Sequence, residues 1–134
     1  MWKYVKSLEY PVNIKKKDLK MAKYLVTQYG GANGELGAAL RYLNQRYTMP
    51  DEKGKALLTD IGTEELAHLE MIGAIVRQLT RGLSAKELEA AGFAPYYIDH
   101  TAAVWPQAAG GVPFNACEFQ CRGDAIADLV EDMA

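Results

Sequence analysis

The sequence predicts an all-α fold, a bundle of amphipathic helices. Apolar side chains recur at alternating steps of four and three residues from residue 54 to residue 79, the period of a helix with one buried face. Asp18 and Ser84 stand directly before further apolar-periodic segments, where helix N-caps are expected. Glycines at 30, 31 and 82 and a proline at 50 separate the segments. These signals predict four helices, at residues 18–30, 34–49, 51–81 and 84–92.

Two segments lack this helical period. Residues 1–17 alternate only weakly and contain Pro11, which predicts an extended N-terminal arm. Residues 93–123 combine prolines, glycines and aromatic residues without any period. Irregular loops of this length are uncommon in compact domains and are usually functional or held by a partner. We therefore predict a long irregular loop that acts as an oligomerisation arm.

The C-terminal residues carry an unusual charge pattern for the end of a helix. Asp124 begins a new apolar-periodic segment, but Glu131 and Asp132 lie in its last turn. Acidic side chains at a helix C-terminus oppose the helix dipole, and Lys or Arg is the usual choice there. This pattern predicts a helix that continues beyond Ala134, so that residues 1–134 form a single but C-terminally incomplete domain.

The composition limits the classes of function. The chain has 134 residues, is 49% hydrophobic and carries a net charge of −2, as expected of one globular domain with no electrostatic preference for nucleic acid. No apolar run reaches the roughly eighteen residues that a membrane helix needs. The first residues lack the apolar core of a signal peptide, which favours a cytoplasmic location. In that compartment Cys117 and Cys121 are expected to be reduced.

A glutamate and a histidine interrupt the longest apolar stripe. Burying either group without a partner would cost several kcal/mol, comparable to the whole stability of a small domain. Both groups would point where only hydrocarbon should lie, and a metal ion would compensate them. The alternatives are a hydrogen-bonded Glu65–His68 pair in the core, or a tilted stripe from which both side chains reach solvent. The stripe consists of Leu58, Ile61, Glu65, His68, Ile72, Ile75 and Leu79.

Glu35 on the preceding helix supplies a second carboxylate. One Glu from one helix and a Glu-x-x-His pair from the next is the arrangement that ferritin-like di-iron and di-manganese bundles repeat twice. The spacing therefore predicts that Glu35, Glu65 and His68 form half of a carboxylate-bridged two-metal site. Such oxygen-rich ligands suit manganese or ferrous iron better than zinc. Tyr42, two turns after Glu35, could donate a hydrogen bond to a ligand carboxylate or simply pack at an interface.

Five stretches of the sequence carry a family resemblance: QYGGANGEL at 28–36, LRYLNQRY at 40–47, LTDIGTEELAHLEM at 58–71, GGVPF at 110–114 and GDAIADL at 123–129. They closely resemble the non-haem manganese catalases, in particular their spore-coat branch. The resemblance covers essentially the whole chain and implies a ferritin-like bundle in which two manganese ions dismutate hydrogen peroxide. It implies that Glu35 and Glu65 are carboxylate ligands, with Glu65 bridging the ions, that His68 is a terminal ligand, and that Tyr42 supports a ligand.

The chain also departs from this family. Members carry a further glutamate on a third helix and a further histidine on a fourth, and both positions would follow Ala134. Either the chain is a fragment, or two chains each contribute Glu35, Glu65 and His68 across a two-fold axis. The resemblance implies a homo-oligomer, with other spore-coat proteins as further partners.

Three functions are compatible with these residues. The first is a manganese catalase that acts on hydrogen peroxide. The second is a structural subunit of a spore coat or shell that keeps the bundle without turnover, a reading that the missing ligands favour. The third is a ferritin-like iron oxidase, because the same ligand types bind iron.

Overall fold

The protein is described by a computed structural model, which places residues 3, 5, 8 and 10–134. In this part of the chain every regular element is a helix, and one isolated bridge joins Gln107 and Pro113. No helix there is both long and apolar enough to cross a membrane. The elements are α1 (Leu19–Gly30), α2 (Glu35–Gln45), the 3-10 helix η1 (Arg46–Thr48), α3 (Glu52–Thr80), α4 (Ala85–Ala90), α5 (Pro95–Asp99) and α6 (Ala125–Asp132).

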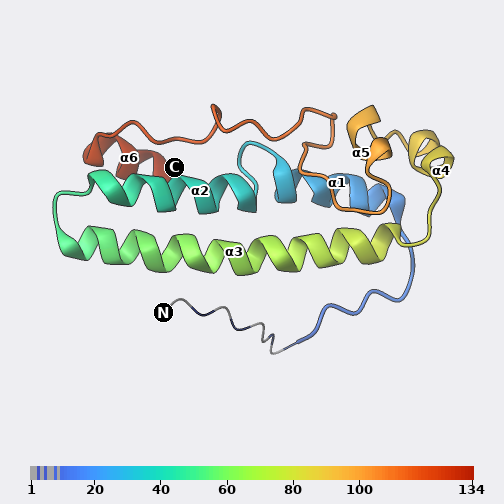
Figure 1. Ribbon diagram of the computed structural model, residues 1–134, viewed down its shortest axis with the longest axis horizontal. Coiled ribbons are helices and arrows are strands. Elements are labelled where there is room, and N and C mark those ends of the chain that lie inside the picture. The colour runs from blue at the N-terminus through green and yellow to red at the C-terminus, as the bar shows by residue number, and fades with distance from the viewer. Residues whose placement is uncertain (1–2, 4, 6–7, 9) are drawn as a thin grey trace.

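Helices α1 and α2 lie nearly end to end and both pack against the long helix α3 (Figure 1). Two glycines of α3 let the helices approach closely. A Cβ on Gly73 would lie 3.0 Å from the Tyr29 ring of α1, and a Cβ on Gly62 would lie 2.8 Å from the Leu43 side chain of α2. The helical prediction for the four segments is confirmed, including the Asp18 and Ser84 caps.

The apolar core lies at one end of this layer, around the C-terminal half of α3. There α1 and α3 are covered by α4 and α5, and the rings of Phe93 and Tyr97 pack 4.6 Å apart. The prediction that residues 93–123 form an entirely irregular loop is therefore wrong at its start, because α5 is helical. Pro95 occupies the first turn of that helix, where its missing N–H costs nothing, and Tyr97 is buried. The buried core residues are Ala22, Val26, Val76, Leu79, Leu88, Phe93 and Tyr97.

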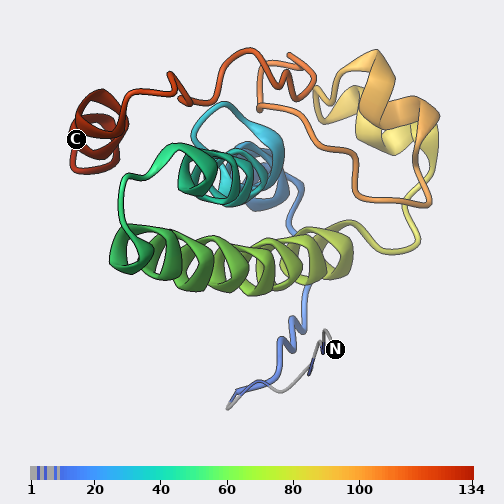
Figure 2. The same ribbon diagram turned by 60° about the vertical axis from the view of Figure 1, so that its left-hand side comes forward.

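After α5 the chain crosses back over α1 and α2 before it reaches α6 (Figure 2). It touches the joint between α1 and α2 directly, since a Cβ on Gly30 would lie 2.3 Å from the Cα of Pro106. The Ala109 N–H donates to the Thr27 hydroxyl at 2.7 Å. The irregular segment is thus fastened to this chain's own helices, and its predicted role in oligomerisation stays a prediction.

The N-terminal arm is extended where the structure describes it. One α3 side chain pairs with its backbone: Gln78 Oε1 accepts from the Ile14 N–H at 2.7 Å, and Gln78 Nε2 donates to the Val12 carbonyl at 2.9 Å. Ile14 also packs against the core. The parts of the predicted arm at residues 1–2, 4, 6–7 and 9 lie outside the described residues.

Helix α6 is held to the preceding loop by a buried carboxylate. Asp128 is 0% exposed, and its two oxygens accept from the backbone N–H groups of Arg122 at 2.7 Å and Gly123 at 3.2 Å. Asp124 caps the helix by accepting from the N–H groups of Ile126 and Ala127. The prediction of a helix beginning at Asp124 is confirmed.

Replacing Asp128 with Ala should destabilise the fold. The change leaves two backbone N–H groups without their acceptor, and we expect a loss of about 2 kcal/mol in the free energy of unfolding. Asp128→Asn keeps one acceptor oxygen and should lose about half as much. Urea denaturation of the three proteins measures the difference, and equal midpoints would contradict this role of Asp128.

Candidate metal centre

The backbone of α2 and α3 sets the positions of the three predicted ligands. Glu35 is the first residue of α2, directly after the Gly34 N-cap, so its carboxylate stands at the positive end of the helix dipole. Glu65 and His68 lie near the middle of α3, three positions apart, and therefore project from neighbouring positions on one face.

The three side chains form one cluster. His68 Nδ1 lies 2.7 Å from Glu65 Oε2 and 3.6 Å from Glu35 Oε2. One ligand atom from each residue can be chosen so that all three lie within 4.8 Å of one another. In the described part of the chain this is the only group of three or more Cys, His, Asp or Glu side chains that meets this criterion. The predicted convergence of these residues is therefore present, together with the Glu65–His68 hydrogen bond that was its alternative.

The cluster is less buried than the apolar stripe suggested. The exposed fractions are 16% for Glu65, 26% for Glu35 and 40% for His68. The expectation that Glu65 and His68 point into hydrocarbon is thus corrected. The physical reason is that, among the described helices, α3 packs mainly against α1, α2 and η1. Helices α1 and α2 lie along one side of α3 (Figure 1).

The surroundings of the cluster raise the pKa of two of its groups, Glu35 and His68. Burial raises the pKa of the Glu35 carboxyl, and hydrogen bonding with Glu65 raises it further. The hydrogen bond to Glu65 also raises the pKa of the His68 imidazole. A divalent cation would replace these protons and neutralise both carboxylates. Two carboxylates and one imidazole are a donor set that fits manganese or ferrous iron.

Tyr42 lies on α2 and is half-buried. Burial raises the pKa of its phenol, and the negative charge of Asp132 on α6 is the next cause. Glu65 and Glu35 act more weakly in the same direction. The charges of both the ligand cluster and Asp132 thus act on the Tyr42 phenol, and its hydrogen bond to a ligand stays a prediction.

Sequence reasoning missed the contribution of Asp132 to this region. Its carboxylate accepts from Gln45 Nε2 at 3.1 Å, which ties α6 to the end of α2. Gln45 is completely buried. The only signal in the sequence was the unfavourable acidic residue in the last turn of the helix, which we interpreted in terms of chain length.

Replacing Asp132 with Asn tests this contact through pH. Burial is the main cause that raises the pKa of Asp132, so the folded protein binds this proton more tightly than the unfolded chain and ionised Asp132 costs stability at neutral pH. Asn keeps the oxygen that accepts from Gln45. We expect the variant to be more stable by about 0.5 kcal/mol at pH 7, and the difference to vanish towards about pH 4. Thermal melts across pH measure this, with Glu118→Gln as an exposed control.

Comparison with known proteins decides the family. The model of the family "Manganese containing catalase" matches residues 1–134, the whole chain. The chain belongs to the manganese catalase family. It is 55% identical over 134 residues to Protein CotJC of Bacillus subtilis and 32% identical over 136 residues to a probable manganese catalase of Clostridium acetobutylicum.

The manganese catalase fold is confirmed by a solved structure. KatB, a manganese catalase from Anabaena PCC7120, superimposes with a TM-score of 0.83 at 28% sequence identity over 97% of this chain. The bundle is thus the ferritin-like helical bundle that the sequence predicted. The chain spans 58% of KatB, 60% of the Clostridium protein and 70% of CotJC.

Proposed function

We propose that this protein is a manganese-dependent catalase-like protein that dismutates hydrogen peroxide to water and oxygen. The observation that carries the proposal is the convergence of Glu35, Glu65 and His68 within 4.8 Å in a chain of the manganese catalase family. Residues 1–134 would form one domain holding half of the ligands of a two-manganese site. The spacing of the ligands and the 32% identity to a probable manganese catalase support it.

Each residue has a distinct part in this proposal. Glu35, Glu65 and His68 would hold the metal, with Glu65 as the bridging carboxylate and His68 as a terminal ligand, and the metal pair would supply the two-electron chemistry of peroxide dismutation. The protein's own contribution is to fix these side chains on two rigid helices. Tyr42 would orient a ligand carboxylate by a hydrogen bond.

Metal analysis combined with oxygen release tests the proposal. The protein is produced in manganese-supplemented medium, its metal content is measured, and hydrogen peroxide is added in an oxygen electrode. We expect manganese bound in preference to iron, with release of oxygen. A protein that holds manganese and releases no oxygen would not be a catalase, and iron bound in preference with oxidation of ferrous iron would indicate a ferritin-like iron oxidase.

A structural role is the second candidate. The described residues bring together two carboxylates and one imidazole, half of the set that a two-metal bundle uses, and His68 is 40% exposed. The resemblance to the spore-coat branch of the family supports a spore-coat subunit, alone or with other coat proteins, in a homo-oligomeric assembly. Ordered assemblies that form equally well with Glu65→Ala and without turnover would favour this role and a location in the coat rather than free in the cytoplasm.

A further inference from the structure

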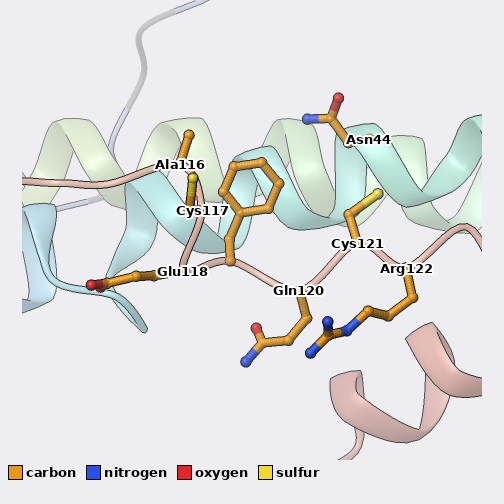
Figure 3. A pocket seen from close by; sticks show the side chains of 8 residues that line it. Asn44, Ala116, Cys117, Glu118, Gln120, Cys121 and Arg122 are labelled. Carbon is orange, nitrogen blue, oxygen red and sulfur yellow. The ribbon is translucent and has the colours of Figure 1, made fainter.

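The only two cysteines of the sequence lie outside the metal centre, on the irregular segment that crosses α2. Cys117 and Cys121 are both free and exposed. They line the same open pocket of about 410 Å³, together with Asn44 of α2 and the neighbouring residues of the segment. Figure 3 shows both side chains rising from one short stretch of backbone. We propose that Cys117 and Cys121 form a peroxide-sensitive thiol pair that closes to an intramolecular disulfide.

The surroundings of Cys121 disfavour it as the first thiol to react. The thiolate is the form that attacks peroxide, so a thiol with a raised pKa reacts more slowly at neutral pH. Partial loss of solvent around the thiol raises the pKa of Cys121, and the negative charge of Asp128 adds to this effect. In the proposed order, Cys117 meets peroxide first and Cys121 resolves the product.

The reaction needs only peroxide as the oxidant. The Cys117 thiolate attacks one peroxide oxygen, the O–O bond breaks, and hydroxide leaves as sulfenic acid forms on Cys117. The Cys121 thiol then attacks that sulfur, the S–O bond breaks, and water leaves as the disulfide forms. Two thiols are oxidised by two electrons, and one peroxide is reduced to two molecules of water.

No helix or strand spans the two cysteines, and the proposed ring closure proceeds by rearrangement of this segment. A disulfide needs the two Cα atoms within about 7 Å. Residues 116–118 and 121 are exposed, and the segment forms no helix or strand. Its ties are a turn in which the Glu118 N–H donates to the Asn115 carbonyl, and the Gln120 carbonyl, which accepts from Gln45 Nε2 at 3.1 Å. Because Gln45 also donates to Asp132, closure next to Gln120 should be transmitted to the docking of α6.

Counting thiols tests the inference. The reduced protein is held at a constant hydrogen peroxide level by continuous addition, quenched with an alkylating reagent and measured by intact mass and peptide mapping. We expect loss of both alkylatable thiols and one peptide containing a Cys117–Cys121 disulfide. Faster proteolysis within α6 after oxidation is expected as well, reversed by a reductant.

Single variants establish the order of the two steps. In Cys121→Ser, a dimedone adduct should accumulate on Cys117, and its rate should exceed that on Cys121 in Cys117→Ser several-fold. Disulfides formed only between chains, both thiols surviving peroxide that fully oxidises added glutathione, or faster reaction of Cys121 would each overturn the inference. These readouts count thiols and depend neither on manganese nor on oxygen release, so they fail or succeed separately from the proposed catalase function.

Discussion

Gly30→Ala is expected to lower the free energy of unfolding by about 3 kcal/mol. The new Cβ would lie 2.3 Å from the Cα of Pro106 and 2.4 Å from the backbone nitrogen of Gln107. Both are backbone atoms, so no side-chain rotation relieves the overlap, and the segment crossing the α1–α2 joint must move. For a domain of this size the melting temperature should fall by roughly 10 °C, measured by circular dichroism.

Gly110→Ala is the matched control for this prediction. Gly110 lies in the same segment, but a Cβ there has no heavy atom within 4 Å, and its φ is not positive. Its melting temperature should stay within about 2 °C of the parent protein, because surface substitutions of this kind have small effects. If both variants melted alike, the close contact between Gly30 and Pro106 would not exist in solution.

Glu65→Gln is expected to reduce manganese affinity at least about 100-fold, or about 2.8 kcal/mol. The change removes one of the two carboxylate charges of the cluster and replaces the acceptor that His68 Nδ1 contacts at 2.7 Å. An amide oxygen is a weaker ligand for a hard cation than a carboxylate. Manganese titration followed by calorimetry measures the loss.

Glu64→Gln separates ligand chemistry from general electrostatics. Glu64 carries the same charge, lies next in sequence and approaches His68 Nε2 at 3.9 Å, but it is 69% exposed. Exposed charges contribute little to binding energy, so the manganese affinity of Glu64→Gln should differ from that of the parent protein by less than about threefold. Equal losses in the two variants would mean that the acidic surface, rather than a defined ligand, attracts the metal.

The helices were predictable because their signals are local. Asp18 and Ser84 accept from N–H groups three residues later, and the 29-residue helix α3 carries an apolar period along its whole length. The approach of Glu65 to His68 follows from helix geometry alone. Glu35 could be added because it lies on α2, the helix that directly precedes α3. One short connection joins the two helices, so their ligand-bearing faces are expected to meet.

Contacts between distant parts of the sequence could not be predicted. The hydrogen bonds of Gln78 with the backbone of Val12 and Ile14 span 66 and 64 residues, and no sequence pattern in either segment predicts them. The same holds for Pro106 on Gly30 and for Gln45 with Asp132. The half-exposed state of His68 depends on which helices cover α3, which is a property of the assembled layer and not of the stripe.

The separation of the core from the ligand cluster along α3 has an evolutionary consequence. The buried apolar residues of α3 are Leu58 near its start and Val76 and Leu79 near its end, and the last two join the main core, whereas Glu65 and His68 lie between them. Substitutions at the ligands therefore spare the packing that holds the subunit together. A gene descended from an enzyme can lose the metal ligands and still encode a stably folded subunit. Evolution from a catalytic protein to a structural one is therefore accessible in this fold.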